Sequence, residues 1–108
     1  MKYSVITYVF NGYEKPREVI NPDPDVEYIM VTDDESTKLN TWKVVVDHSL
    51  DGLSGFDKCY YVRYNCFKYC HTDICIRIDG SIEIKGSLDR LVDEFVKGDY
   101  DAAFMVHP

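Results

Sequence analysis

Residues 74–85 (Ile-Cys-Ile-Arg-Ile-Asp-Gly-Ser-Ile-Glu-Ile-Lys) hold the strongest candidate for chemistry in this chain. A run of β-favouring residues stops at the acid Asp79, and Gly80 and Ser81 then let the chain turn. A carboxylate at the carboxyl end of a buried strand stands where open α/β sheets bind their ligands, and it suits Mg²⁺ or Mn²⁺ on a diphosphate. The alternative is a plain hairpin turn, which Asp-Gly between two β-favouring runs also predicts. The two interpretations are compatible, because a turn can present a carboxylate.

Polar residues follow two other predicted strands. Asp33 and Asp34 could bind a ribose or a base edge, as acids at strand ends do in dinucleotide folds, or they could form a solvated turn. Asn11-Gly12 allows close approach of a ligand to the backbone because Gly12 has no Cβ, although an ordinary turn has the same sequence. No glycine-rich phosphate loop is present in the sequence.

Three basic residues are candidates for contact with an anion. Lys58 and Arg63 belong to a predicted helix and could reach a diphosphate, and the alternative for both is a solvated helix face. Arg77 lies inside an apolar strand, so it calls for a carboxylate partner. The candidates for this partner are Asp79, Glu83 and Asp101.

The cysteines and histidines give weaker signals. Cys66, Cys70, His71 and Cys75 could be drawn as a metal cluster, but no Cys-x-x-Cys spacing is present, and free cysteines usually behave as small buried hydrophobes. Without an export signal, we expect no disulfide framework. His107 is the only histidine at the end of a predicted strand.

The order of predicted elements places these side chains. Asp57 and Ser87 are the expected N-caps of the two helices, and Gly98 is the expected stop of the second. The pattern predicts strands over residues 3–10, 26–31, 42–46, 74–78, 82–84 and 102–106, and helices over residues 58–69 and 88–97.

This alternation predicts a single α/β domain over residues 1–108 with a largely parallel sheet. The carboxyl ends of parallel strands share one edge, so Asn11, Asp33, Asp79 and His107 should meet there. The last predicted strand stops at His107-Pro108. We therefore expect the first part of a larger fold, or a very small version of one.

Composition narrows the classes of function. The net charge is −7 and the pI is about 4.8, which argues against a nucleic-acid binder but not against a nucleotide ligand. No secretory signal is recognisable, and no window approaches the roughly 20 apolar residues of a membrane span. The expectation is a soluble, cytoplasmic protein.

Several segments resemble a known family, in order along the chain. They are residues 3–8 with Asn11-Gly12-Tyr13, residues 23–28, 31–34 and 42–45, the Ile-Arg-Ile-Asp-Gly-Ser-Ile-Glu-Ile segment at 76–84, and residues 101–108. They resemble domain of unknown function 616, a poorly characterised family of glycosyltransferases. Two positions depart from the family's pattern. Ser81 replaces the second acid of the common Asp-x-Asp motif, and Arg77 replaces a tryptophan.

The resemblance implies a Rossmann-like fold of the GT-A type that binds a nucleotide-diphospho-sugar, with UDP-hexose as the expected donor, for transfer to a glycan or another acceptor. It implies a divalent metal, Mn²⁺ or Mg²⁺, for which Asp79 would be the only carboxylate. It places Asp33, Asp34 and residues 7–12, including Thr7 and Tyr8, on the nucleoside side. The family continues beyond His107-Pro108, where its acceptor-side residues lie, and no catalytic residue is named here. The alternative is a noncatalytic α/β domain that acts through protein–protein association, for example as a homo-oligomer.

Overall fold

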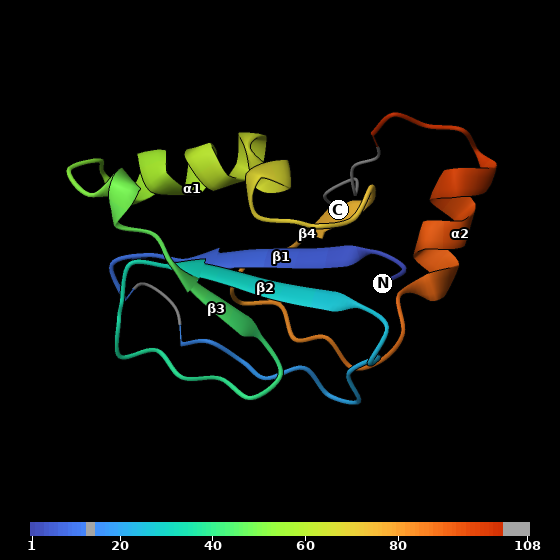
Figure 1. Cartoon of the computed structure of the whole chain (residues 1–108), viewed down its shortest axis with the longest axis horizontal. Coiled ribbons are helices and arrows are strands. Elements are labelled where there is room, and N and C mark those ends of the chain that lie inside the picture. Colours follow the sequence, from blue (N-terminus) through green and yellow to red (C-terminus); the bar gives the residue numbers. More distant parts are fainter. Residues whose placement is uncertain (13–14, 103–108) are drawn as a thin grey trace.

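The computed structural model describes residues 1–12 and 15–102 of the chain. It contains one four-stranded sheet, two α-helices and two short 3₁₀ helices (Figure 1). The strands are β1 (Ser4–Val9), β2 (Glu27–Thr32), β3 (Lys43–Val46) and β4 (Cys75–Arg77), and the helices are α1 (Gly55–Tyr64), α2 (Asp89–Lys97), η1 (His48–Leu50) and η2 (Cys66–Lys68). The α/β class is therefore confirmed.

The sheet is entirely parallel, in the order β3-β2-β1-β4. The chain steps outward from β1 to β2 and β3, then crosses the sheet through α1 to place β4 on the other side of β1. The direction of winding thus reverses between β1 and β4, which is where open α/β sheets bind ligands. Ile6 pairs with Arg77, the last residue of β4, so β1 extends beyond the end of its neighbour.

Two of the predicted strands need separate comment. The segment at residues 82–84 is not a strand: Ile84 is buried in the core, and its carbonyl accepts one hydrogen bond from the N–H of Ile20, at 2.8 Å. One isolated bond does not make a ladder, so the hairpin prediction is wrong while the turn after Asp79 is correct. The strand predicted at residues 102–106 lies almost entirely outside the described residues.

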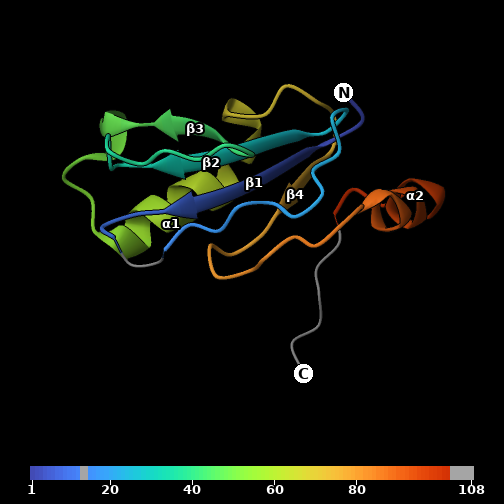
Figure 2. The ribbon, with the colours of Figure 1, turned by 90° about the horizontal axis from the view of Figure 1, so that it is seen from below.

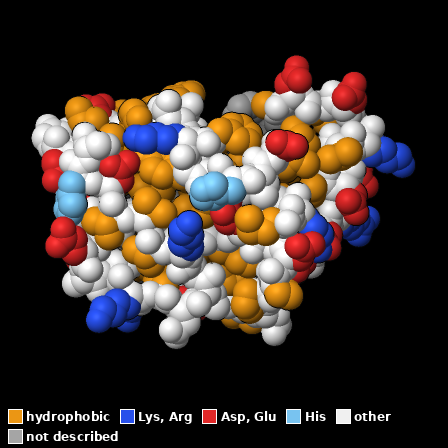
Figure 3. Space-filling model, in the orientation of Figure 1, with side chains coloured by type: hydrophobic (Ala, Val, Ile, Leu, Met, Phe, Trp, Pro, Cys, Tyr) orange, Lys and Arg blue, Asp and Glu red, His pale blue; other side chains and the backbone are white. Residues whose placement is uncertain are grey.

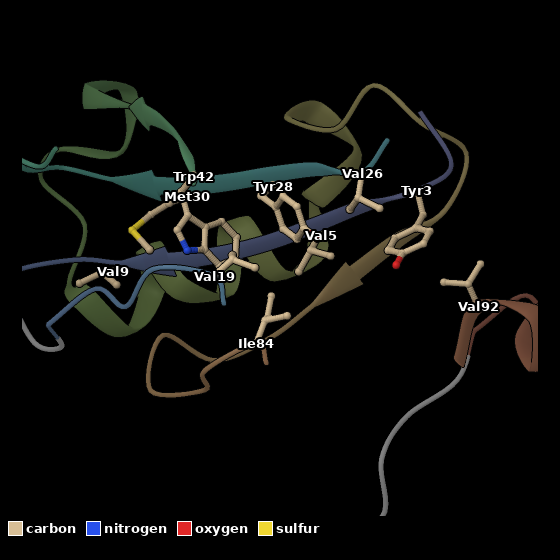
Figure 4. Packing of buried hydrophobic residues seen from close by; sticks show 10 residues of the cluster. All are labelled: Tyr3, Val5, Val9, Val19, Val26, Tyr28, Met30, Trp42, Ile84 and Val92. Atoms are coloured by element: carbon tan, nitrogen blue, oxygen red, sulfur yellow. The ribbon is translucent and has the colours of Figure 1, made fainter. Parts of the chain in front are cut away.

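The two faces of the sheet are covered differently. α1 lies over one face, above the sheet in Figure 1, where Ile6, Ile29 and Val31 of the strands pack with Val62 of the helix. Connecting segments run below the opposite face, which carries a second core around Val5, Met30 and Trp42. Figure 4 shows this second core, to which Val19 and Ile84 contribute from the connections and Val92 from α2: its members are Tyr3, Val5, Val9, Val19, Val26, Tyr28, Met30, Trp42, Ile84 and Val92.

α2 lies beside the sheet rather than over it (Figure 2). Val92 is its buried residue. Its N-cap position is Leu88, one residue after the predicted Ser87, although the Ser87 hydroxyl still accepts a hydrogen bond from the N–H of Asp89 at 3.1 Å. Gly98 ends the helix as predicted. Within the described ranges, no helix has the length and apolar character needed to cross a membrane.

α1 begins three residues before the predicted start. Ser54 is its N-cap, and the Ser54 hydroxyl accepts a hydrogen bond from the N–H of Asp57 at 3.1 Å, so the prediction that Asp57 caps this helix is wrong. The helical face was also mispredicted in part. Lys58 is buried, whereas Tyr60 and Phe67, which we expected in the apolar stripe, are exposed.

Candidate functional site

The carboxyl edge of the sheet gathers polar residues from all four strands. Asn11 follows β1, Asp33 follows β2 and Asp79 follows β4, as the sequence predicts. Asp47 follows β3 and was missed, although the same signal, an acid directly after a β-favouring run, precedes the loop there. Its carboxylate accepts hydrogen bonds from the Ser49 N–H (2.9 Å) and the Tyr69 hydroxyl (2.6 Å). His107 lies outside the described residues.

Asp33 and Lys58 form a buried ion pair at this edge. Lys58 Nζ lies 2.8 Å from Asp33 Oδ2, and the two side chains are only 8% and 15% exposed. Burial by itself raises the pKa of the Asp33 carboxyl, but the hydrogen bonds from Lys58 and from the Asn11 N–H outweigh it and hold this pKa below its usual range. The pair connects β2 to the first turn of α1, so its partners already satisfy much of the charge that a ligand would meet.

Asn11 completes this corner. Its backbone N–H lies 3.2 and 3.3 Å from the two carboxylate oxygens of Asp33. With its side-chain amide oriented to satisfy both neighbours, Asn11 donates to Asp33 Oδ2 at 3.0 Å and accepts from the Gly55 N–H at 3.3 Å. A Cβ on Gly55 would lie 2.6 Å from the Asn11 amide, so a glycine is required at this start of α1. Asn11 and Gly12 both have positive φ (57° and 65°), which confirms the turn.

The other residues predicted on the nucleoside side lie in different environments. Thr7 is 2% exposed, and its hydroxyl has no hydrogen-bond partner among the described residues. Tyr8 is buried under α1. Asp34 is exposed and accepts hydrogen bonds from the Ser36 hydroxyl (2.6 Å) and N–H (2.9 Å), which lower the pKa of its carboxyl. Asp34 therefore has the local turn geometry, and its role toward a ligand stays a prediction.

Arg63 reaches from α1 to β1, next to the point where the winding reverses. Its Nη2 donates to the Tyr8 hydroxyl at 3.3 Å, and its guanidinium lies 5.3 Å from the centre of the Tyr60 ring. The Nε atom is buried and has no hydrogen-bond partner within residues 1–12 and 15–102. A buried N–H without an acceptor is unfavourable, so this guanidinium has unused capacity to bind an anion.

Arg77 lies on the same side of the sheet, but without the predicted carboxylate partner. Its Nη1 donates to the backbone carbonyl of Arg63 at 3.3 Å. No ion pair of Arg77 occurs in the described part of the chain, with Asp79, Glu83 or Asp101 or otherwise. A carbonyl satisfies one donor of the guanidinium and leaves its positive charge uncompensated at short range.

Asp79 follows β4 on the same edge. It is exposed, and its carbonyl accepts a hydrogen bond from the Ile82 N–H at 3.0 Å, which closes the turn through Gly80 and Ser81. The pKa of Arg63 is raised, first by the hydrogen bond to Tyr8 and also by the charge of Asp79. Asp79 therefore lies within electrostatic reach of Arg63, and the edge between β1 and β4 carries both signs of charge.

The side chains around Asp79 do not fit a metal ion that the chain would hold by itself. Among the described residues, no group of three or more His, Cys, Asp or Glu side chains could ligate one. Asp79 offers one carboxylate, and Ser81 stands at the position of the second. Nearby Arg63 also places a positive charge where a cation would bind.

Other surface features lie away from this edge. A hollow of about 360 Å³ adjoins Lys2 and His71, and another of about 440 Å³ adjoins Leu91 and Tyr100 beside α2. Figure 3 shows exposed hydrophobic side chains gathered in the region of α2, where Leu91 and Val96 are more than half exposed. Neither hollow contains a residue predicted for the ligand.

Comparison of the chain with protein-family models, with curated proteins and with solved structures finds no match in any of the three.

Proposed function

We propose that this chain binds a nucleotide-diphospho-sugar at the carboxyl edge between β1 and β4, as the donor-binding domain of a glycosyltransferase of the GT-A type. The observation that carries the proposal is the strand order β3-β2-β1-β4, which puts the reversal of winding beside Arg63 and Asp79. The choice of a UDP-hexose as donor rests on the sequence resemblance alone.

Arg63 is the proposed diphosphate contact. Its guanidinium has a buried N–H without an acceptor, and arginine binds phosphate oxygens with two parallel hydrogen bonds. Lys58, the other predicted contact, is held by Asp33 at 2.8 Å, so it would have to exchange a buried partner to bind a ligand. Arg63 is therefore the better of the two candidates.

The positive charge of Arg63 would also stabilise the nucleoside diphosphate as it leaves, because charge that develops in the transition state is stabilised by preoriented donors. The expected Mn²⁺ or Mg²⁺ stays a prediction. The proposal does not depend on a metal bound by the chain alone, since the residues around Asp79 do not fit one.

One observation favours the alternative, a domain that acts through association. Phe56, Tyr60 and Tyr64 form an aromatic row along the outer face of α1, with ring centres 4.5 and 5.8 Å apart, and Phe56 and Tyr64 are 68% and 75% exposed. Exposed apolar rows of this kind are more frequent at protein interfaces than on free surfaces. Association does not predict a response to nucleotides, so ligand binding separates the two hypotheses.

The test is thermal unfolding of the protein with UDP and UDP-hexoses, each with and without Mn²⁺. A ligand at a hundredfold its Kd should stabilise the fold by about 2.7 kcal/mol. Arg63→Gln should abolish most of this gain, whereas Arg90→Gln, a matched change at an exposed position of α2, should leave it intact. Asp79→Asn should remove any part that requires Mn²⁺, with Asp93→Asn as its control.

Two results would contradict the proposal. One is a well-folded protein whose unfolding temperature does not change with any nucleotide. The other is an Arg63→Gln variant that is stabilised as much as the unaltered protein. A nucleotide response that is unaffected by Mn²⁺ or by Asp79→Asn would keep the binding site and remove the metal assignment.

A further inference from the structure

Two thiols face each other where the crossover from α1 meets the sheet. Cys70 lies just after η2, and Cys75 is the first residue of β4. Their sulfur atoms are 3.0 Å apart, and both side chains are half-buried free cysteines. Only four residues separate them along the chain. The two groups are therefore in contact in the folded protein, with a separation little longer than a sulfur–sulfur bond requires.

The segment between the two thiols is fixed to the sheet by several hydrogen bonds. The N–H and the Nδ1 atom of His71 lie 2.8 and 2.6 Å from the Glu27 carboxylate. The Thr72 hydroxyl lies 2.7 Å from the Ser4 hydroxyl and donates to the Ile74 carbonyl at 2.8 Å. These contacts hold the loop in one conformation, so the thiols meet because of the fold and not by chance encounter.

The contact also makes the two thiols unequal. The thiol of Cys75 donates a hydrogen bond to the sulfur of Cys70, which lowers the pKa of Cys70 and raises that of Cys75. Cys70 is thus the better nucleophile, since the thiolate is the reactive form. Cys75 keeps its proton until Cys70 has reacted.

We propose that Cys70 and Cys75 are a redox modification site that closes to a disulfide when the protein meets hydrogen peroxide. The Cys70 thiolate attacks one peroxide oxygen, the O–O bond breaks, and Cys70 becomes a sulfenic acid while hydroxide leaves. The Cys75 sulfur then attacks the Cys70 sulfur, the S–O bond breaks, and the Cys75 proton leaves with the hydroxyl group as water. The two sulfurs lose two electrons in total, and the peroxide gains them. A dithiol reductant reverses the reaction by thiol–disulfide exchange.

The bond would join the end of the α1–η2 crossover to the start of β4. Arg77, two residues further along, donates to the backbone carbonyl of Arg63, so the disulfide would act on the same connection that relates α1 to β4. The inference rests only on the cysteine geometry. It stands or falls independently of nucleotide binding.

The experiment treats the intact, reduced protein with hydrogen peroxide, quenches it in acid, and labels the remaining thiols with N-ethylmaleimide after unfolding. The expected product has lost two hydrogens, carries label on Cys59 and Cys66 only, and regains all four labels after treatment with dithiothreitol. Peptide mapping should show one bond between Cys70 and Cys75.

Single substitutions by serine give the controls. Cys70→Ser and Cys75→Ser should abolish the loss of two hydrogens, and Cys59→Ser, at a site on α1 outside the pair, should leave the rate of closure unchanged within about twofold. Cys66→Ser decides the specificity, because Cys66 lies near enough to Cys75 to affect its pKa. A bond that maps to Cys66, or oxidised protein that still labels at both Cys70 and Cys75, would overturn the proposal.

Discussion

The buried ion pair between Lys58 and Asp33 should be a large single contribution to the stability of this fold, and Lys58→Met tests it. Methionine keeps most of the lysine stem, so the change removes the charge with little loss of packing. Asp33 would then be a buried carboxylate without its cation, 15% exposed and bonded only to Asn11. The structure therefore predicts destabilisation through the residue that stays, not through the one that is replaced.

The expected loss follows from the burial of both partners. Removing one partner of a fully buried pair costs about 3–5 kcal/mol, because the other charge is left uncompensated. The bonds from Asn11 and the remaining exposure of Asp33 place Lys58→Met at the lower end, at about 3 kcal/mol. For a chain of 108 residues this lowers Tm by about 12 °C. The double variant Lys58→Met/Asp33→Asn carries no buried charge and should recover about 2 kcal/mol relative to the sum of the single changes.

The assay is urea unfolding of the two single variants and the double variant, followed by the fluorescence of the single tryptophan, Trp42, and by circular dichroism. Lys38→Met, at an exposed loop position, is the control and should change stability by less than about 0.5 kcal/mol. The reasoning is refuted if Lys58→Met costs less than about 1 kcal/mol, or if the single effects add within about 0.5 kcal/mol.

Three further predictions use other parts of the molecule. Thr7→Val removes a buried hydroxyl that has no hydrogen-bond partner within the described residues, so it should raise the free energy of unfolding by about 1 kcal/mol in urea titrations; a loss of stability would show that the hydroxyl is satisfied. Burial raises the pKa of Glu27, but the hydrogen bonds from His71 and Ser4 outweigh it, so the pKa lies below its ordinary 4.5. This carboxylate therefore stabilises the fold above about pH 4.5, and that contribution is lost as the pH falls through the lowered pKa; Glu27→Gln should flatten the acid limb of stability against pH, and an unchanged limb would contradict the assignment. Gly12→Ala should cost about 1 kcal/mol because φ is +65°, with Gly86→Ala, which has open space and no positive φ, as a near-neutral control; equal effects would show that conformation is not the cause.

The positions of the four main strands could be predicted because their information is local. The runs at residues 3–10, 26–31, 42–46 and 74–78 are rich in β-branched and aromatic residues and end at polar residues, and the structure has a strand in each. Alternation with helices was enough to predict a parallel sheet, and thereby that Asn11, Asp33 and Asp79 share its carboxyl edge. The assignment of a sugar donor rests on the resemblance and stays a proposal.

The pairing of side chains across that edge could not be predicted in the same way. On α1, polar and apolar residues occur on every side of the helix, so periodicity did not show that Lys58 faces the sheet and Tyr60 faces solvent. Asp33 decides it from 25 positions away, because a buried lysine is stable only beside a carboxylate that the fold brings to it. The same holds for Arg77, whose partner is a backbone carbonyl on α1 and not an acid nearby in sequence.

Asp79 combines both kinds of information. Its own sequence determined that the chain turns at Asp79-Gly80-Ser81, since glycine and the preceding acid favour a turn wherever they occur. Whether a second strand follows depends on a partner for its hydrogen bonds, and residues 82–84 find only Ile20. The sequence by itself thus determined the strands, the turns and the edge at which polar groups collect. Only the tertiary structure decided which of those groups neutralise one another and which, like Arg63, keep capacity for a ligand, because that depends on contacts between residues far apart in the chain.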